Sequence, residues 1–272
     1  MAFTEDLLLP SRGIIYLLPS FDGYVKVKPF TTKAYKSLLA GNANDNAIRQ
    51  FADTCLVDCP VKAKDMCDED LLAILFKSRI MTLGNTLKTE VRCPRCNKLQ
   101  DVNWDLSELD VNYLFADEYP IKLTLPASNT VIKLRYPTGA DTRKAKIEAE
   151  KRASKFNMQT NEFTNTFLTV STIDVDYKDI VEKAEWYEAL NPQDSIYIDE
   201  AISTMKDLFG IQLTKEIKCT NCDREFSTII DLSSDFFRTA RPVITSLTSK
   251  TGNMASTFAK PNVSEQKHED IN

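Results

Sequence analysis

The sequence predicts an α+β fold built from two similar halves. Two short segments match each other at a constant offset of 126 residues, Thr89–Cys96 and Lys215–Cys222, and each contains Cys-x-x-Cys. The register continues from Asp105-Leu106-Ser107 to Asp231-Leu232-Ser233, which is too long for coincidence. Helical and extended hydrophobic periodicities also follow each other in the same order before both segments.

These patterns divide the chain into four parts. We expect an N-terminal arm, a first pseudo-repeat, a second pseudo-repeat and a flexible C-terminal tail, with bounds 1–23, 24–118, 119–242 and 243–272. The arm has Pro and Gly around a polar turn, so it is expected to be ordered but not helical. The tail is rich in Ser, Thr, Lys and Asn, which is typical of disordered segments.

The first pseudo-repeat opens with alternating apolar and basic residues, typical of a half-buried strand over 24–28. Thr31 or Thr32 then caps a short helix that ends before Gly41. Apolar residues at helical spacing predict two more helices, the second ended by Gly84. A hairpin with Cys93 and Cys96 at its tip follows; the expected ranges are helices 45–57 and 68–83 and strands 86–92 and 99–105.

The second pseudo-repeat is expected to keep this order with longer helices. Val131–Arg135 repeats the alternation of the first strand, and Thr138 stands where Thr31 stood. Asn191-Pro192 is typical of a helix start, and Gly210 is predicted to end that helix after Phe209. The other expected helices cover 141–156, 162–171 and 177–190, and a strand, a knuckle and a second strand come last.

The four paired cysteines, Cys93, Cys96, Cys219 and Cys222, predict one structural zinc site per chain. Thiolate sulfur is a soft ligand that suits tetrahedral zinc, and the x-x spacing lets both sulfurs of a pair face one ion. Ordinary zinc ribbons separate their pairs by about 15 to 20 residues. Because residues 97–218 intervene here, the zinc knuckles of the two hairpins are expected to form one four-cysteine zinc site that joins the halves.

Other interpretations of the cysteines stay open. Two separate ions or unmetallated knuckles are the alternatives, and Cys55, Cys59 or Cys67 could be recruited to either half. Buried free cysteine is the commoner explanation for those three, since Cys behaves as a small hydrophobe. A redox pair is disfavoured because such pairs normally lie between a strand and a helix.

Composition bears on the class of function. The chain has 272 residues and a net charge of -5, and it lacks a continuous basic block, which argues against general nucleic-acid binding. No apolar run approaches the ~20 residues that span a bilayer, so we expect a soluble protein without membrane contact. The single histidine is His268, in the predicted tail, and no phosphate-binding glycine motif occurs. We therefore expect neither an enzyme nor a small-molecule substrate.

Both ends of the chain resemble a known family. Leu9-Pro10-Ser11-Arg12-Gly13-Ile14-Ile15-Tyr16, followed by the 24–28 strand and Thr31-Thr32, resembles the baseplate hub assembly proteins of T-even-type tailed phages. Cys219-Thr220-Asn221-Cys222, a return strand and Phe236-Phe237-Arg238 resemble the end of those proteins. The resemblance covers roughly residues 9–240.

This resemblance implies work in assembly, as a chaperone or a low-copy hub component that binds other phage hub or tail proteins. The expected location is the host cell cytoplasm or the virion tail baseplate. The main alternative is a zinc-ribbon protein that binds nucleic acid in phage gene expression, although Glu148 and Glu150 interrupt the basic helix that such a role would use. The candidate partner contacts are Leu9, Pro10, Ser11, Arg12, Gly13 and Tyr16 in the arm, and Phe236, Phe237 and Arg238 at the end. Packing of the arm over its own core is the alternative for those residues.

Overall fold

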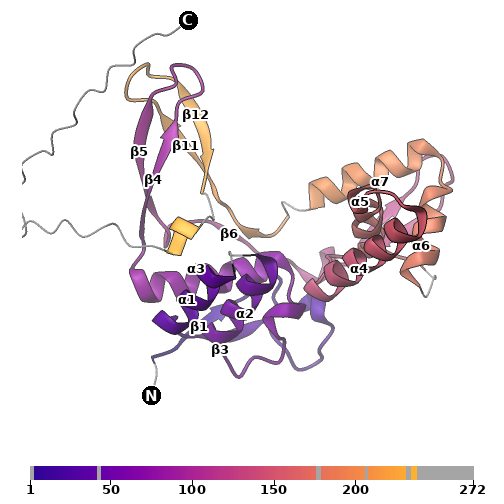
Figure 1. The fold of residues 1–272 in the computed structure, drawn as a ribbon, viewed down its shortest axis with the longest axis horizontal. Helices are drawn as coiled ribbons and strands as arrows, with labels where there is room; N and C mark the ends of the chain where they lie inside the picture. Colours follow the sequence, from indigo (N-terminus) through magenta and orange to yellow (C-terminus); the bar gives the residue numbers. More distant parts are fainter. Residues whose placement is uncertain (1–2, 42–43, 176–178, 206–207, 231–233, 238–272) are drawn as a thin grey trace, which may run out of the picture. The chain divides into compact units, whose positions relative to one another are not determined.

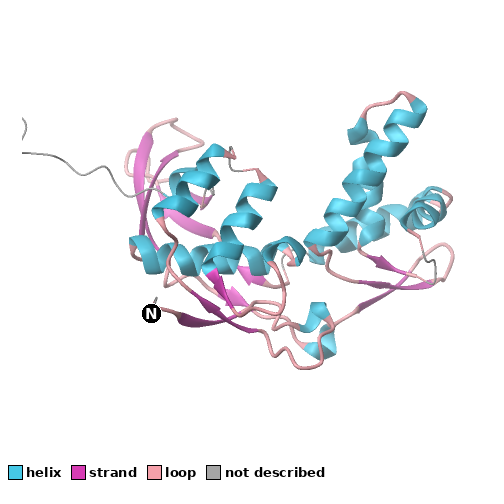
Figure 2. Cartoon of the chain, turned by 60° about the horizontal axis from the view of Figure 1, so that its bottom comes forward, coloured by secondary structure: helices cyan, strands magenta, loops and turns pink. Residues whose placement is uncertain are grey.

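The computed structural model describes residues 3–41, 44–175, 179–205, 208–230 and 234–237. This part of the chain combines seven α-helices with small antiparallel sheets, which confirms the α+β class (Figure 1 and Figure 2). The predicted tail, together with Arg238 and His268, lies outside the described residues. None of the described helices has the length and apolar character needed to cross a membrane.

The first helices pack on a three-stranded antiparallel sheet of order β1-β2-β3. Its β1 strand, within the predicted arm, was not predicted from the sequence. Thr31 caps the first helix by accepting a hydrogen bond from the Ala34 N–H. The elements are β1 (Glu5–Leu8), β2 (Tyr24–Val27), α1 (Thr32–Ala40), α2 (Asp45–Cys55), β3 (Leu56–Val57) and α3 (Asp68–Leu83).

A second sheet, of order β7-β8-β9, has the same antiparallel arrangement. Thr138 caps its first helix in a reciprocal capping box with Asp141. Helix α6 has no α-helical counterpart among the described residues between β3 and α3, where a 3-10 helix (Ala63–Asp65) lies. The elements are β7 (Ile121–Thr124), β8 (Val131–Leu134), α4 (Gly139–Phe156), α5 (Thr160–Ser171), β9 (Ile173–Asp174), α6 (Ile180–Glu188) and α7 (Pro192–Met205).

The two sheets share a loop structure that sequence reasoning missed. Leu9-Pro10 follows β1 and Leu125-Pro126 follows β7, and both leucines are fully buried. In each case a buried aspartate, the third residue of a later helix, accepts hydrogen bonds from the loop backbone. Asp70 of α3 binds the Ser11 N–H at 2.9 Å, and Asp194 of α7 binds the Ala127 N–H at 2.7 Å. The two Leu-Pro dipeptides are 116 residues apart, and two residues are too few for hydrophobic periodicity to reveal the match.

Two hairpins and a short strand pair complete the fold. The strands β4 (Thr86–Arg92) and β5 (Leu99–Asp105) have the predicted bounds and pair antiparallel throughout. The second hairpin consists of β11 (Thr214–Lys218) and β12 (Glu225–Ile229). Between the hairpins, β6 (Val111–Asn112) pairs with β10 (Gly210–Ile211), a contact that the sequence did not predict.

Gly210 does not end a helix, which corrects the prediction. Helix α7 ends at Met205, and Gly210 begins β10 with φ of 117°. Phe209 is buried outside the helix, with its ring 4.4 Å from that of Tyr136. An apolar residue that packs after a helix end has the same spacing as one within the helix, so periodicity did not separate the two cases. Gly84 ends α3 as predicted.

The described residues form two hydrophobic cores that do not follow the predicted boundary at 118 and 119. Ile230, Phe236 and Phe237 pack in the core of the first sheet. Ile15 and Cys67 pack instead in the core of the second sheet. Each core thus contains side chains from the predicted part that forms the other sheet. The domain division itself stays a prediction.

We predict that Gly23→Ala destabilises the arm much more than Gly84→Ala. Both glycines have positive φ, +83° and +84°, which costs a β-carbon about 1–2 kcal/mol. A β-carbon on Gly23 would also lie 2.4 Å from the Arg12 carbonyl carbon, whereas Gly84 has no atom within 4 Å. Urea denaturation of both variants measures the difference. Equal losses would show that the close contact with Arg12 is not important.

Candidate metal centre

The four paired cysteines lie at the tips of the two hairpins. Cys93 and Cys96 follow β4, and Cys219 and Cys222 follow β11. Their four sulfur atoms all lie within 4.8 Å of one another. The structure therefore brings together two pairs of thiols that are separated by more than 120 residues in the sequence.

Backbone hydrogen bonds give both knuckles the same shape. The Cys93 N–H donates to the Lys98 carbonyl at 3.0 Å, and the Cys219 N–H donates to the Arg224 carbonyl at 2.8 Å. The left-handed residue of each turn is Asn97 or Asp223, with φ of 62° and 56°. Asn and Asp tolerate this conformation better than most residues. The 126-residue offset seen in the sequence thus extends to the backbone of the turns.

The sulfur positions fit a tetrahedral metal and not a disulfide. The Cys93 and Cys222 sulfurs are 3.7 Å apart, and those of Cys96 and Cys219 are 3.6 Å apart. Four sulfurs placed tetrahedrally at the usual zinc–sulfur bond length would be about 3.8 Å apart. All four cysteines are free thiols in the structure. The donor set and its spacing fit a structural zinc ion, with all four positions filled by protein.

The backbone favours thiolates at this centre. The N–H of Cys96 holds the pKa of the Cys93 thiol below its usual value. The N–H of Lys98 lowers the pKa of Cys96 to about 6. Although the Arg224 N–H acts in the opposite direction, burial and the neighbouring sulfurs raise the pKa of Cys222 to about 11. Such mutual repulsion between sulfur ligands is relieved when a divalent cation binds between them.

We predict that the protein keeps its metal at neutral pH and loses it in acid. Metal binding requires thiolates, so protons compete increasingly as the pH falls below the pKa of Cys96, about 6. Dialysis against one chelator concentration at about pH 7.5 and about pH 4.5, followed by metal analysis, measures the loss. Equal retention at both pH values would contradict thiolate ligation.

Side-chain contacts reinforce the pairing of the hairpins. The Gln100 carbonyl oxygen on β5 accepts a hydrogen bond from the Thr220 N–H at 2.9 Å, and its amide donates to the Lys218 carbonyl at 3.3 Å. The Lys215 ammonium lies 5.6 Å from the centre of the Trp104 ring. These contacts were not expected from the sequence, because nothing in it indicated which strands would face each other.

The remaining cysteines lie apart from this centre. Cys55 and Cys67 are buried, and burial raises the pKa of both thiols. Cys59 is half-buried, and burial raises its pKa also. Among the described residues, only the two knuckle pairs form a group of three or more metal-binding side chains. Cys55 and Cys67 are therefore buried free thiols, as expected, whereas the free thiol Cys59 is only half-buried.

Comparison with known proteins concerns nearly the whole described chain. The family model described as T4 bacteriophage base plate protein matches residues 12–238. The chain belongs to this family. No curated protein and no solved structure matched the chain. The resemblance to T-even-type baseplate proteins is therefore confirmed at the level of the family.

In this baseplate family member, the Leu-Pro-Ser-Arg-Gly segment is held mainly inside the fold. Asp70 is fully buried, and it accepts hydrogen bonds from the Ser11 hydroxyl at 2.5 Å and the Tyr16 hydroxyl at 2.6 Å. Burial raises the pKa of Tyr16, so its hydroxyl stays protonated and donates to the carboxylate. Leu9, Pro10, Ser11 and Gly13 are buried, Tyr16 is half-buried, and Arg12 is exposed.

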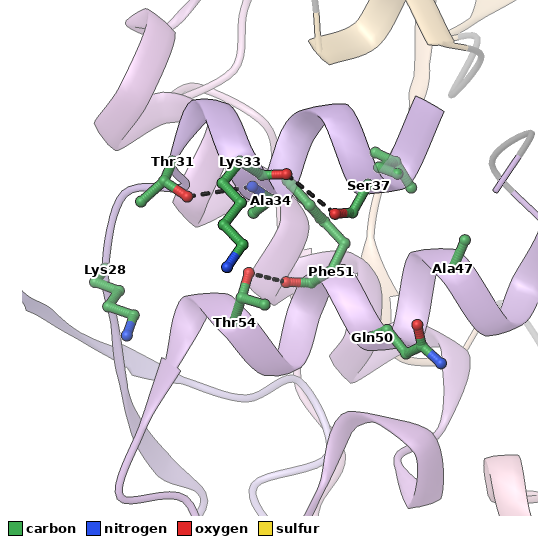
Figure 3. Close-up of a pocket in the computed structure, with 10 residues that line it drawn as sticks. Lys28, Thr31, Lys33, Ala34, Ser37, Ala47, Gln50, Phe51 and Thr54 are labelled. Atoms are coloured by element: carbon green, nitrogen blue, oxygen red, sulfur yellow. Dashed lines mark hydrogen bonds between the residues drawn. The ribbon is translucent and has the colours of Figure 1, made fainter. Parts of the chain in front are cut away.

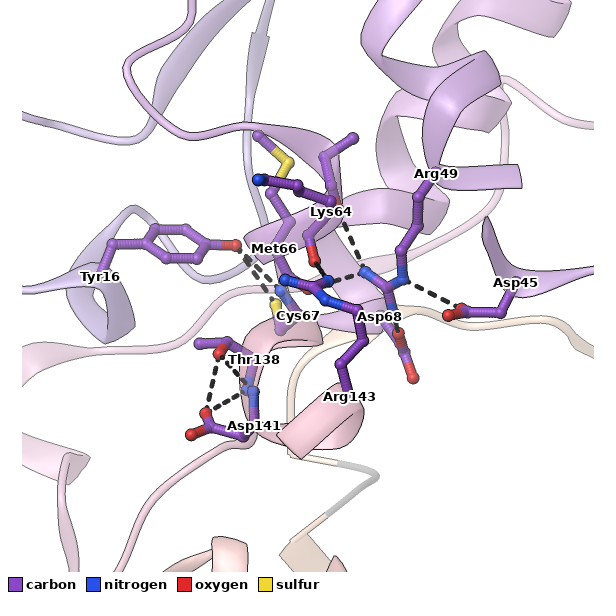
Figure 4. A network of polar contacts seen from close by, with 11 residues as sticks. Tyr16, Asp45, Arg49, Lys64, Met66, Cys67, Asp68, Thr138, Asp141 and Arg143 are labelled. Atoms are coloured by element: carbon purple, nitrogen blue, oxygen red, sulfur yellow. Dashed lines mark hydrogen bonds and ion pairs between the residues drawn. The ribbon is translucent and has the colours of Figure 1, made fainter. Parts of the chain in front are cut away.

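A polar network beside this segment connects helices of both halves (Figure 4). Arg49 of α2 is buried and donates to the carbonyls of Ala63 and Met66 at 3.1 and 3.0 Å. The Met66 carbonyl also accepts from the Gly139 N–H at the start of α4, at 2.9 Å. Arg143 of α4 pairs with Asp65 at 2.7 Å. In the described structure, the basic side chain of Arg143 is therefore paired with a carboxylate of the same chain.

The Phe-Phe pair at the chain end is also buried. Phe236 and Phe237 are 2% and 8% exposed, and the Phe236 ring lies 4.7 Å from that of Phe76. Buried Arg79 donates to the Phe236 carbonyl at 3.1 Å. Packing within the chain accounts for these two residues and for the buried arm residues Leu9, Pro10, Ser11 and Gly13. Direct contact of the candidate residues with a partner stays a prediction, and among the described candidates Arg12 is the one that is exposed.

Proposed function

We propose that this baseplate family member helps to assemble the baseplate hub through contacts with other phage proteins, as a chaperone or a low-copy hub component. The match to the baseplate family over residues 12–238 carries the proposal. We propose further that it is not an enzyme. The paired cysteines support a structural role, because all four ligand positions of a zinc site would be occupied by protein.

We also propose that one zinc ion per chain is held by Cys93, Cys96, Cys219 and Cys222. The bound ion would cross-link the two hairpins, and the chain's own backbone turns would orient the sulfurs. Support comes from the matching turns and the sulfur spacing described above. A fixed pair of hairpins would offer a rigid surface to partners, and rigid surfaces lose little entropy on binding.

The two halves are proposed to be pseudo-repeats of one unit, with bounds 24–118 and 119–242. Support comes from the equal strand orders of the sheets, the two capping threonines and the two buried aspartates. A further match, of β1 and Leu9-Pro10 to β7 and Leu125-Pro126, lies outside the proposed bounds of the first unit, in the predicted arm.

Deletion of the gene from the phage tests the assembly function. Electron microscopy of infected-cell lysates should show tails or baseplates arrested before completion, with recovery when the wild-type chain is supplied in trans. Mass spectrometry of purified virions then separates the two roles, because a hub component stays in the particle and a chaperone remains in the host cytoplasm. Complete baseplates without the chain would refute the function. Salt-dependent retention of DNA or RNA by the purified chain would favour the nucleic-acid alternative.

A further inference from the structure

A groove between α1 and α2 lies on the first half, away from the paired cysteines in the sequence (Figure 3). Its volume is about 450 Å³. Leu38 and Phe51 are buried apolar residues of its lining, and Lys28 and Lys33 stand together at one end. Among the described residues, neither ammonium group has a hydrogen bond or an ion pair.

The second half shows what covers the corresponding surface there. Val27 pairs with Leu56 in the first sheet, and Leu134 pairs with Ile173 in the second sheet. The residue that follows Val27 or Leu134 donates its N–H to the C-terminal end of a helix: Lys28 to the Cys55 carbonyl of α2, and Arg135 to the Thr172 carbonyl after α5. The two pairs are therefore equivalent. By this correspondence Gln50 on α2 matches Phe167 on α5. Gln50 is exposed, whereas Phe167 is 1% exposed and lines a cavity beside α6.

Helix α6 therefore covers the face of α5 on which Phe167 lies. The corresponding face of α2, on which Gln50 lies, borders the groove. Lys183 of α6 donates to the Ile173 carbonyl at 2.6 Å. Burial lowers the pKa of Lys183, on which the charges of Arg135, Asp174, Asp141 and Lys144 also act. The positions of Arg135, Asp141 and Lys144 correspond to Lys28, Ala34 and Ser37, which line the groove. The described residues between β3 and α3 contain the short 3-10 helix Ala63–Asp65 but no α-helix that would correspond to α6.

The groove and the surface under α6 differ in charge, and this difference indicates which charge the bound helix would carry. Arg135 is paired with Asp141, with both contacts at 2.8 Å. Ala34 replaces that aspartate in the groove, so Lys28 lacks the equivalent carboxylate, and Lys33 adds a second positive charge. A helix resembling α6 would need an acidic side chain where α6 has Lys183.

We propose that the groove between α1 and α2 binds an amphipathic helix of a partner protein, with a carboxylate facing Lys28 and Lys33 and apolar side chains over the groove floor, in which Leu38 and Phe51 are buried. This inference rests on the proposed assembly function, because it takes the occupant from another protein. Helices commonly bind in apolar grooves through residues spaced three and four apart. α6 itself buries Ile180 and Ala184 at this spacing.

Fluorescence anisotropy with two helix-stabilised peptides tests the proposal. Both carry the sequence of residues 179–190, one unchanged and one with Lys183→Glu, and a scrambled acidic peptide serves as a composition control. The purified full-length chain should bind the Lys183→Glu peptide about tenfold more tightly than either of the others. Equal affinities for the three peptides would overturn the proposal.

Two substitutions on the same helix locate the binding. Lys33→Glu should weaken binding of the acidic peptide about tenfold, whereas Lys36→Glu, on an exposed residue outside the groove lining, should change it less than about twofold. Equal effects of the two variants would overturn the proposal. So would a dimer of the free chain that Ser37→Trp dissociates, because the occupant would then be a second copy. Failure of peptide binding would leave the deletion test of assembly unaffected, so the two proposals can fail separately.

Discussion

Cys219→Ser is expected to release the metal and to separate the tips of the two hairpins. The substitution removes one of four sulfurs that lie within 4.8 Å, and the remaining three cannot fill a tetrahedral structural site. Structural zinc contributes about 10–16 kcal/mol of apparent binding free energy, which matches or exceeds the usual net stability of a domain. Metal analysis and thermal unfolding measure the two effects.

Cys59→Ser is the matched control for this experiment. Cys59 is a half-buried free thiol outside the cluster, so its replacement should leave the metal content unchanged and alter stability far less. The account of the centre would be wrong if Cys219→Ser kept its metal, or if both variants unfolded at the same temperature. Cys93→Ser should behave as Cys219→Ser, since the two residues occupy equivalent turns.

Asp70→Ala is expected to cost about 3–5 kcal/mol of unfolding free energy, because it leaves several buried donors without an acceptor. The Ser11 N–H and hydroxyl and the Tyr16 hydroxyl all donate to this carboxylate. Asp70→Asn keeps one acceptor oxygen, that of the amide, and should lose less unfolding free energy. Urea unfolding of the full chain measures both variants.

A surface aspartate provides the comparison for Asp70. Asp101 is exposed on β5, so Asp101→Ala should change the unfolding free energy by less than about 0.5 kcal/mol. If Asp70→Ala were as mild as Asp101→Ala, the buried carboxylate would not be what holds the Leu-Pro-Ser-Arg-Gly segment. Limited proteolysis gives an independent readout, since release of the arm would expose the Arg12–Gly13 peptide bond to trypsin.

Sequence patterns predicted the helices and strands whose bounds are set by neighbouring residues in the chain. The bounds of α3, β4 and β5 were predicted correctly, because regular apolar spacing and Gly84 define them. Of the two candidate caps Thr31 and Thr32, Thr31 is the N-cap, and Thr138, predicted to stand at the equivalent position, is the N-cap of α4. The four-cysteine cluster was predicted from a duplicated spacing, which needs no knowledge of the fold.

Long-range contacts were harder to predict, since they leave weak local signals. Two residues of β10 pair with two of β6, a length at which alternation carries no information. Asp70 and Asp194 look like ordinary acidic residues of a first helical turn, where negative charge is common. Their burial follows from loops that arrive from distant parts of the chain. The burial of Phe236 and Phe237 could not be predicted, because the core in which they pack is formed by residues far away in the sequence.

Metal content of the purified full-length chain is the most direct test of the account. The chain should contain one zinc ion per molecule when prepared without chelator, and removal of that ion should make Cys96 and Cys219 react much faster with an alkylating reagent, because zinc-bound thiolates are protected. Two zinc ions per chain, or a stable fold with no metal, would contradict a single site that joins the two hairpins.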